Sequence, residues 1–313
     1  MRVLVTGGTG LIGTHLVQRL RALNWQVVCL VRKEVRWEDP EIQVVYADLA
    51  DPAALEQVRT AIGPVDGVFH VGALLPDPAI PEASAYMQVN GTATRHLLEM
   101  ARALQARFFV HFSTTAVYGI PRLRPVDEHH PLDPQTAYAK SKLCGEFHCR
   151  IAQYEQPTDP VITILRIPSP YGAGLRQGSI LPFFIGQVLQ GKEIHWFGSG
   201  SRTQNFIHID DVVQACLLAA RSRQPDLFLV GGPDSIPMKQ LAEKIIALIP
   251  DSPSRATAVD RPDPQEGYAW ELNLAHGQRQ LGYRPLITLD EGLRDYIAYL
   301  RHPAGFRPWW SRS

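Results

Sequence analysis

The fold is decided by the stretch Thr6-Gly7-Gly8-Thr9-Gly10-Leu11-Ile12-Gly13, which joins a β-branched run to a segment with apolar residues at helical spacing. At such a strand-to-helix turn, Gly7 permits the tight bend, Gly10 lets the backbone approach a pyrophosphate, and Gly13 allows close packing of helix on strand. The free N–H groups at the helix start favour phosphate. The stretch therefore predicts a dinucleotide site, whose cofactor contacts we expect from Gly7, Thr9, Gly10, Leu11, Ile12 and Gly13.

Outward from this turn, short β-branched runs alternate with amphipathic segments through the first half of the chain. The expected strands cover residues 3–6, 26–31, 44–47, 65–71, 108–112 and 161–167. The expected helices cover residues 11–23, 51–62, 83–106 and 136–153. This alternation predicts right-handed βαβ units and a parallel sheet that is covered by helices on both faces.

Prolines and glycines break the regular pattern after residue 167. Further helices are expected at 180–189, 210–220, 237–248 and 289–300, and short strands at 206–209 and 228–230. We therefore expect an α/β protein with a Rossmann-type doubly wound parallel sheet and a small C-terminal α/β cap that binds substrate. The boundaries are 1–167 for the nucleotide-binding domain, with 204–230 returning to it, 168–203 and 231–301 for the cap, and 302–313 for a tail.

Composition excludes several classes of partner. The 313 residues carry 31 Lys+Arg and 31 Asp+Glu, so no bulk charge draws the protein to nucleic acid. No apolar run has the length of a membrane span or a signal peptide, so we expect no membrane partner and a cytoplasmic location. The cysteines Cys29, Cys144, Cys149 and Cys216 are scattered without a CxxC pair, and neither a metal site nor a disulfide is expected.

The end of the second expected strand bears on the choice between NAD and NADP. An acidic residue there usually binds the ribose 2′-OH of NAD, but this chain has Val31 followed by Arg32 and Lys33. Arg32 suits a 2′-phosphate and favours NADP, whereas a solvated Arg32 leaves NAD open. Asp48 and Leu49 are expected to hold the adenine, with helix capping as the alternative role for Asp48.

A tyrosine and a lysine lie one helical turn apart in Tyr138-Ala139-Lys140-Ser141-Lys142. Tyr138 and Lys142 share one face of the expected helix, whereas Lys140 lies off that face. An ammonium group at this spacing, helped by the nicotinamide ribose, would lower the pKa of the phenol. The pair therefore predicts an acid/base that works near neutral pH.

With these motifs in place, the chain resembles the extended short-chain dehydrogenase/reductase family, which includes NDP-sugar epimerases and dehydratases. The resemblance runs from Met1 to about residue 300. Its motifs, each given with its first residue, are TGGTGLIG at 6, DL at 48, HVGA at 70, VNGT at 89, STTAVYG at 113, YAKSK at 138, LRIPSPYGAG at 165, GSGSRTQNFIHIDDV at 198, RPD at 261 and LGYRP at 281.

The resemblance implies roles for individual residues. Tyr138 would be the acid/base, Lys142 would bind the nicotinamide ribose, and Thr114 would hydrogen-bond the reacting oxygen, a role for which Ser113 is the weaker candidate. Asn90 matches a residue that supports the active-site helices. The implied cofactor contacts beyond the glycine turn are Arg32, Asp48, Leu49, Val71, Gly72, Ala73, Asn90, Tyr138, Lys142, Ile167 and Pro168.

Departures from the family pattern reduce the number of reaction types that the chain is expected to catalyse. Dehydratases of the family carry acidic residues just after the Ser/Thr, where this chain has Thr115 and Ala116, so elimination of water is disfavoured. Sugar-nucleotide members place an asparagine at Ser169 and an arginine at Gln204, which leaves Arg202 and Arg261 as candidate diphosphate ligands. The expected substrate-binding residues are Thr114, Thr115, Ser169, Arg202, Gln204 and Arg261.

Three functions follow, each with a small-molecule substrate or ligand. The first is a sugar-nucleotide epimerase that passes hydride to the nicotinamide and back through a transient ketone. The alternative is an NADP-dependent ketoreductase on a non-nucleotide carbonyl, which Arg32, Ser169 and Gln204 favour. The retained catalytic residues disfavour the third, a non-catalytic regulator. The resemblance also implies a homodimer through the helices around Leu97 and Leu143.

Overall fold

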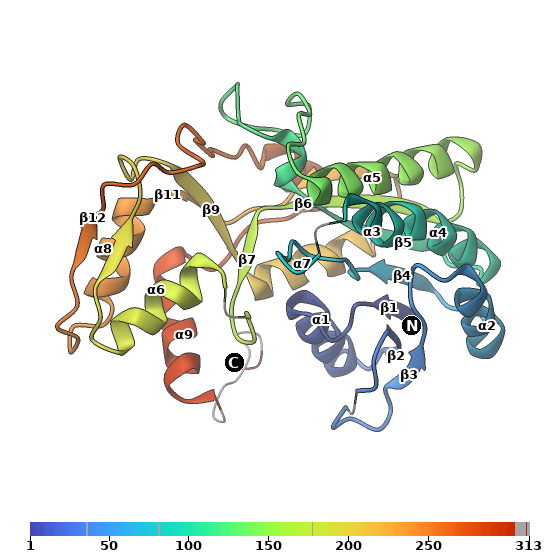
Figure 1. Ribbon diagram of the computed structural model, residues 1–313. Helices are drawn as coiled ribbons and strands as arrows, with labels where there is room; N and C mark the ends of the chain where they lie inside the picture. The colour runs from blue at the N-terminus through green and yellow to red at the C-terminus, as the bar shows by residue number, and fades with distance from the viewer. Residues whose placement is uncertain (36, 81, 177, 304–310, 312–313) are drawn as a thin grey trace.

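The computed structural model describes residues 1–35, 37–80, 82–176, 178–303 and 311. Figure 1 shows two parts side by side, a sheet flanked by helices that contains the N-terminus and a smaller part around α6, α8 and α9. Most of the expected tail at 302–313 lies outside the described residues. Within the described residues, no helix is both long and apolar enough to cross a membrane.

The larger part is built on one parallel sheet of seven strands in the order β10-β6-β5-β4-β1-β2-β3. The order reverses between β1 and β4, and a ligand binds at the carboxyl ends of the strands at such a switch point. This confirms the doubly wound sheet. The strands are β1 Arg2–Thr6, β2 Gln26–Val31, β3 Gln43–Tyr46, β4 Gly67–His70, β5 Phe108–Thr114, β6 Val161–Ile167 and β10 Asp226–Leu229.

Helices cover both faces because the strands are apolar on both sides. In β1, Val3 and Val5 belong to one buried cluster with residues of α1 and α7, whereas Leu4 belongs to another with residues of α2, α4 and α5. Strand residues alternate between faces, so each cluster forms one side of the sheet. The helices are α1 Leu11–Ala22, α2 Pro52–Ile62, α4 Ala93–Ala103, α5 Ala137–Glu155 and α7 Ile209–Ala219.

The prediction of a single continuous α-helix over 83–106 is wrong, because a π-helical turn interrupts it. The chain forms a short α3, Ala83–Tyr86, then a π-helical turn η1, Met87–Thr92, and only then α4. The wider turn presents the buried Asn90 side chain, whose carbonyl accepts from the backbone N–H of Leu74 at 2.7 Å and whose amide donates to Ser141 Oγ at 3.0 Å. Such π-turns are frequent at functional sites.

The helix α5 crosses η1 at two glycines. A Cβ on Gly91 would lie 3.0 Å from Cys144 Sγ, and a Cβ on Gly145 would lie 2.9 Å from the Asn90 carbonyl oxygen. Both contacts are tighter than ordinary packing, so the small residues let α5 lie directly on η1. The crossing fixes the position of the helix that carries Tyr138 and Lys142.

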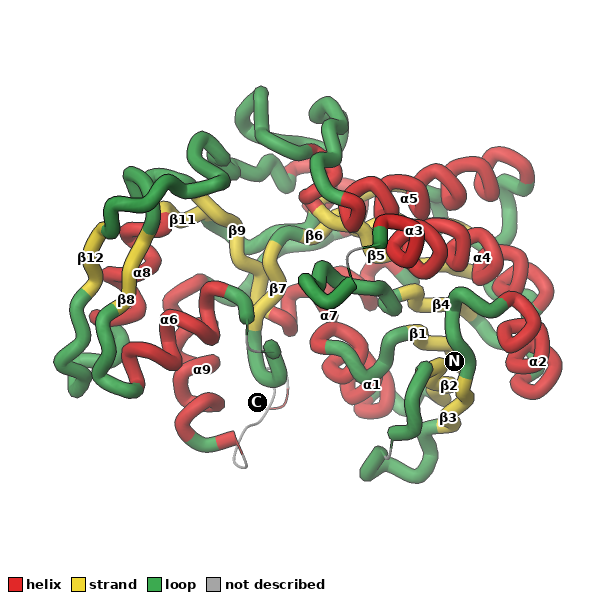
Figure 2. The backbone as a smooth tube through the Cα atoms, in the orientation of Figure 1, coloured by secondary structure: helices red, strands yellow, loops and turns green. Residues whose placement is uncertain are grey.

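The smaller part contains two short sheets and three main helices. Strand β9 pairs with β7 on one side and β11 on the other, and Figure 2 shows β7 and β9 between the helices of the two parts. Of the stretch 204–230, β9 thus lies in the small sheet, while α7 packs on α1 and β10 joins the large sheet. The remaining elements are β7 Ser169–Tyr171, α6 Ile180–Leu189, β8 Ile194–Trp196, β9 Thr203–His208, β11 Ser235–Pro237, α8 Met238–Ala247, β12 Ala256–Ala258 and α9 Leu289–Arg301, with turns η2 Thr115–Tyr118 and η3 Gly277–Leu281.

Candidate active site

The glycine turn after β1 has the geometry that a dinucleotide needs. Gly7 has φ +70, and a Cβ there would lie 2.5 Å from Gly72 Cα. A Cβ on Gly13 would lie 2.1 Å from the Gly7 carbonyl oxygen, whereas a Cβ on Gly10 would approach that oxygen only to 3.4 Å. The fold itself therefore requires Gly7 and Gly13, and the open side of Gly10, at the start of α1, leaves the space that a pyrophosphate would fill.

This difference gives a matched pair of variants. We expect Gly13→Ala to lower the free energy of unfolding by roughly 1–3 kcal/mol, because its methyl group would clash with backbone. We expect Gly10→Ala to leave stability within about 0.5 kcal/mol but to weaken cofactor binding at least about tenfold, because its methyl group would occupy the phosphate position. Urea unfolding and cofactor titration measure both. A Gly10→Ala protein with wild-type affinity would contradict the phosphate site.

The neighbouring strand ends form the wall of the cofactor site. A Cβ on Gly72 would lie 3.0 Å from Leu49 Cδ1, so Leu49 packs against the backbone that follows β4. Asp48 is exposed and accepts from the backbone N–H of Ala50 at 2.9 Å, while the N-cap of α2 is Asp51. Arg32 is exposed at the end of β2, and within the described part of the chain it makes no hydrogen bond or ion pair.

A buried hydrogen-bond chain ties this wall to η1. Gly72 N–H donates to Thr6 Oγ1, which contacts His70 Nδ1 at 2.9 Å, and His70 Nε2 contacts Thr94 Oγ1 at 3.1 Å. Thr94 already donates to the Asn90 carbonyl, so the proton of His70 is on Nε2. Burial, aided by the charge of Lys142, lowers the pKa of His70 to about 3. His70 is therefore a neutral spacer between the cofactor turn and the helix support.

Tyr138 and Thr114 meet beside this wall. Thr114 ends β5 level with Ile167 of β6, and Tyr138 lies in the first turn of α5, where Thr136 is the N-cap. Burial raises the pKa of Tyr138 to about 12, and a hydrogen bond with the Thr114 side chain lowers it in part. The structure thus joins two of the three expected catalytic residues directly. The lowering that we expected from Lys142 does not appear in the protein alone.

Lys142 is the third residue, and it is 2% exposed. Burial lowers the pKa of its ammonium group to about 8, although Glu146, one turn further along α5, favours the charged form. Because its pKa is about 8, Lys142 has lost its proton before the phenol of Tyr138 ionises near pH 12, so it does not stabilise the phenolate in the protein alone. A cofactor ribose and a positively charged ring beside Tyr138 would lower the pKa of the phenol.

The buried lysine predicts a pH-dependent stability. Below pH 8 both states carry the charge, and the folded state bears the full cost of burying it; between pH 8 and 10.5 the unfolded state binds more protons, so this cost declines as pH rises. We expect Lys142→Met in the cofactor-free protein to unfold with about 3 kcal/mol more free energy than wild type at pH 7. Urea unfolding at pH 7 and pH 10 should show the gap narrowing. An equal gap at both pH values would contradict the shifted pKa.

Beneath the site lies a buried ion pair that the sequence did not reveal. Arg166 of β6 binds Glu146 of α5 through Nε and Nη2 at 2.9 and 2.6 Å, and both side chains are 1% exposed. Arg166 also donates to Tyr118 Oη, and Ser113 donates to Glu146. Ser113 therefore faces this network rather than Tyr138. The signals were an arginine within an apolar strand and a glutamate four residues after Lys142.

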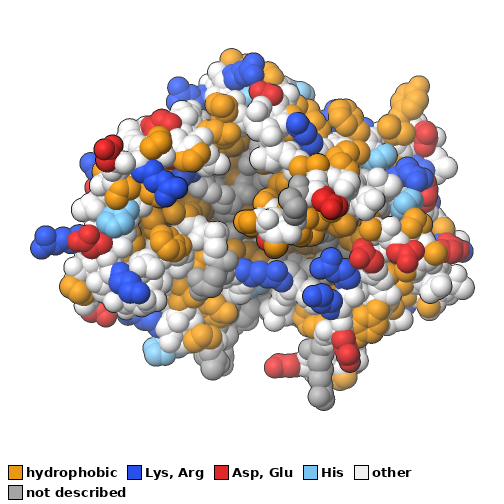
Figure 3. Space-filling model, viewed as in Figure 1, with side chains coloured by type: hydrophobic (Ala, Val, Ile, Leu, Met, Phe, Trp, Pro, Cys, Tyr) orange, Lys and Arg blue, Asp and Glu red, His pale blue; other side chains and the backbone are white. Residues whose placement is uncertain are grey.

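Three of the expected substrate ligands, Ser169, Arg202 and Gln204, lie together in the smaller part, whereas Thr114 and Thr115 end β5 and begin η2 in the larger part. Gln204 on β9 donates to Ser169 Oγ at 2.5 Å, and Arg202, two residues earlier, donates to Asp263 at 2.6 Å. Arg261 lies apart from them, with its guanidinium 4.9 Å from the centre of the Phe197 ring. Figure 3 shows the surface hollowed between the two parts, with Lys and Arg side chains along its lower edge.

Two histidines accept hydrogen bonds from backbone N–H groups. His130 is 5% exposed, and its Nε2 accepts from the backbone N–H groups of Arg122 and Leu123. His208 is the N-cap of α7, and its Nδ1 accepts from the Asp210 N–H. In both cases an imidazole nitrogen satisfies backbone donors that water would otherwise take.

A switch-point sheet, a glycine turn and a Tyr/Lys pair on one helix define an enzyme of the NAD(P)-dependent Rossmann class. The sequence comparisons narrow this class. Residues 3–231 match the NAD dependent epimerase/dehydratase family, and the chain belongs to that family, as an extended short-chain dehydrogenase/reductase.

The relatives span nearly the whole chain. A putative UDP-glucose 4-epimerase of Methanocaldococcus jannaschii is 28% identical, over 96% of this chain and 98% of the relative. The dTDP-D-glucose 4,6-dehydratase of Homo sapiens is 28% identical, over 98% and 91%. The structure of a dTDP-glucose 4,6-dehydratase from Streptomyces venezuelae with NAD bound superposes with a TM-score of 0.83 at 26% identity, over 98% and 99%. The UDP-glucose 4-epimerase of Thermotoga maritima has the same fold, with a TM-score of 0.87 at 23% identity, over 96% and 99%.

Proposed function

We propose that this protein is a sugar-nucleotide epimerase. The observation that carries the proposal is the hydrogen-bonded pair of Tyr138 and Thr114 at the carboxyl edge of the sheet, next to a glycine turn with space for a pyrophosphate. In this proposal residues 1–167 hold the cofactor together with α7 and β10 from the stretch 204–230, and residues 168–203 and 231–301 hold the substrate together with β9. The named relatives, which include epimerases of UDP-glucose, support the same substrate class.

The residues divide the work as follows. A bound nicotinamide would supply a hydride acceptor for the sugar carbon. Tyr138 takes the proton of the sugar hydroxyl and gives it back, while Thr114 donates a hydrogen bond to the same oxygen. Lys142 would hold the ribose hydroxyls of the cofactor and place a positive charge near the phenol. Asn90 and the glycine crossing hold α5 so that these groups stay in register.

Elimination is not part of the proposal. A dehydratase needs a general acid for the departing hydroxyl and a base at a second sugar carbon. Thr115 and Ala116 occupy the positions where those groups would stand, within the turn η2. Thr115 is 6% exposed, and neither a threonine nor an alanine is a general acid, so these two positions provide none. A reaction that only moves hydride is consistent with this turn.

We infer NADP as the preferred cofactor, because Arg32 is exposed and β2 ends without a carboxylate. The solved relatives with a named cofactor contain NAD. Titration of the purified protein with each cofactor, together with an Arg32→Ala variant, decides between them. Preference for NADP that disappears in Arg32→Ala supports the inference, and equal affinity for both cofactors in wild type contradicts it.

The epimerase is tested by turnover without added cofactor. We expect the purified protein to retain nicotinamide and to convert UDP-glucose to its epimer with no net change in absorbance at 340 nm. Stoichiometric consumption of NADPH with a ketone substrate, and no change of UDP-sugars, would instead establish the NADP-dependent ketoreductase. Ser169 and Gln204, which replace residues of the sugar-nucleotide pattern, are the observation that favours this second function.

We also propose a homodimer. Phe147, Ile151 and Tyr154 lie on one face of α5 at positions i, i+4 and i+7, and they are 53%, 53% and 88% exposed. Apolar residues at this spacing cover a continuous stripe that water solvates poorly. Sedimentation at micromolar concentration should show a dimer, and Ile151→Glu should give a monomer that still binds cofactor. A wild-type monomer would remove the proposal.

A further inference from the structure

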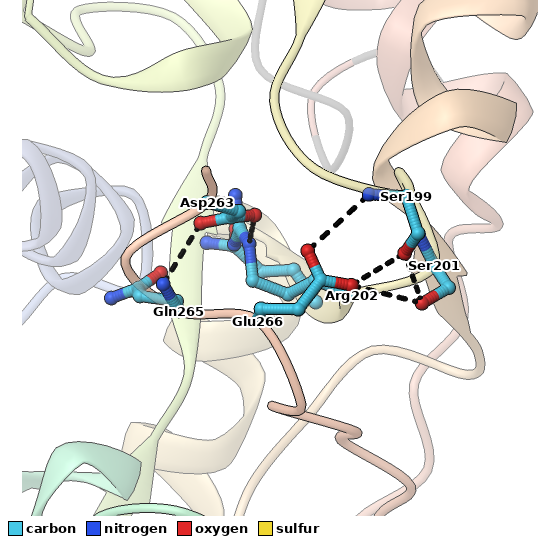
Figure 4. A network of polar contacts seen from close by, with 7 residues as sticks. Ser199, Ser201, Arg202, Asp263, Gln265 and Glu266 are labelled. Atoms are coloured by element: carbon cyan, nitrogen blue, oxygen red, sulfur yellow. Dashed lines mark hydrogen bonds and ion pairs between the residues drawn. The ribbon is translucent and has the colours of Figure 1, made fainter. Parts of the chain in front are cut away.

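The guanidinium of Arg202 is held in place by a carboxylate. Arg202 Nε donates to Asp263 Oδ2 at 2.6 Å, and the two side chains are only 16% and 6% exposed. The other carboxylate oxygen of Asp263 accepts from the backbone N–H of Gln265 at 2.9 Å. Figure 4 shows Asp263 between Arg202 and Gln265. The backbone N–H of Gln265 therefore holds the Asp263 carboxylate in place, and this carboxylate holds one edge of the Arg202 guanidinium.

Two further hydrogen bonds lead from Arg202 through Gln204 to Ser169. Arg202 Nη1 donates weakly to Gln204 Oε1 at 3.4 Å, and the Gln204 amide donates to Ser169 Oγ at 2.5 Å. Ser169 begins β7, two residues after Ile167, which pairs with Thr114 at the end of β5. The hydrogen bonds thus run from Arg202 through Gln204 to Ser169, near the carboxyl end of β6. Ser169 Oγ accepts in this chain, so its hydroxyl proton can be donated to a substrate.

We propose that Asp263 is a positioning residue that turns Arg202 toward the phosphate groups of a nucleotide-sugar substrate, an inference that rests on the function proposed above. Arg202 comes directly before β9, and its Nη1 donates to Gln204 Oε1, so the two side chains lie next to each other. The guanidinium is held at its Nε edge, so its outer N–H groups keep the fork geometry that binds phosphate oxygens in pairs.

Whether the loss of Asp263 strengthens or weakens phosphate binding distinguishes a positioning role from a simple effect of its charge. Asp263 is an anion next to an anion site, so Coulomb's law alone predicts that its removal strengthens phosphate binding. If Asp263 positions Arg202, its removal weakens binding instead. Asp263→Asn suits the test because its carbonyl can still accept from Gln265 N–H, while its amide group cannot accept from Arg202.

The same cluster offers a matched control. Glu266 accepts from Ser199 Oγ at 2.5 Å and from the Ser199 backbone N–H at 3.3 Å, on the side of the cluster away from Asp263 in Figure 4. Glu266→Gln removes a negative charge from the same cluster and leaves the Arg202–Asp263 pair intact. A shift that comes from charge alone would appear in both variants.

The experiment is calorimetric titration of cofactor-loaded protein with UDP, for wild type, Asp263→Asn, Glu266→Gln, Arg202→Gln and the Arg202→Gln/Asp263→Asn double variant. Thermal unfolding checks that each variant is folded. We expect Asp263→Asn to weaken UDP binding about tenfold, as loss of a charge-assisted hydrogen bond does. Glu266→Gln should stay within about twofold, and Asp263→Asn should have no further effect once Arg202 is replaced.

Each other outcome is decisive. Unchanged or tighter binding by Asp263→Asn overturns the positioning role, and so does an equal loss in the Arg202→Gln background. Wild-type protein that fails to bind UDP overturns the proposed nucleotide substrate, and this role of Asp263 with it. The two failures are therefore distinguished by the wild-type titration alone.

Discussion

Tyr138→Phe is expected to lower kcat by at least about 1000-fold while the Kd for the cofactor stays within about twofold. The substitution removes only the phenolic oxygen, which in the proposed function is the group that exchanges a proton with the sugar hydroxyl. The ring remains in the first turn of α5, and the cofactor contacts of the glycine turn and Lys142 are untouched. Steady-state kinetics with UDP-glucose and a cofactor titration measure the two quantities.

The control for this variant lies two residues along the same helix. Lys140 is exposed and off the face that carries Tyr138 and Lys142. Lys140→Met should therefore keep kcat within about twofold of wild type, as surface substitutions usually do. If Tyr138→Phe retains full activity, the assignment of the acid/base is wrong whatever the control shows.

Glu146→Leu is expected to lower the free energy of unfolding by about 3–5 kcal/mol, the second large effect. Arg166 is 1% exposed, and its pKa is raised through its bonds to Glu146, although burial opposes this, so it stays charged. Without Glu146 that charge would be left in the core, where it is costly. Urea unfolding at pH 7 gives the difference.

A double variant shows whether the cost of Glu146→Leu comes from the unpaired charge of Arg166 or from lost side-chain packing. Glu146→Leu/Arg166→Met removes both ions, so we expect it to recover at least about half of the loss caused by Glu146→Leu, because no unpaired ion remains. The exposed pair Arg95 and Glu99 on α4 provides the comparison, and Glu99→Gln should cost less than about 1 kcal/mol. A double variant as unstable as the single one would mean that side-chain packing, rather than charge, sets the cost.

Local signals carried most of the sequence-based prediction. The alternation of strands and helices, the glycine turn and the Tyr138/Lys142 spacing all depend on residues within a few positions of one another, and the sheet followed from them. The grouping of Thr114 with Tyr138 came from the family resemblance instead. The π-turn at Asn90 breaks this rule. Its cause is a set of bonds to Leu74 and Ser141, which lie 16 and 51 positions away.

Long-range pairs could not be read from the sequence in the same way. Arg202 and Asp263 are 61 positions apart, and Glu146 and Arg166 are 20 apart on different elements. No local periodicity connects such residues, and only the folded topology decides which charged groups are buried together. The single usable sign was chemical, since a charged side chain within an apolar strand needs a partner.

The chain of hydroxyls around His70 has a consequence for how the enzyme responds to acid. An imidazole that takes up its second, charging proton only near pH 3 stays uncharged through the range in which free histidines titrate. Moderate acidification therefore leaves the hydrogen-bond chain from Gly72 through Thr6 and His70 to Thr94 unchanged. A loss of turnover in weakly acidic buffer would have to originate elsewhere in the molecule.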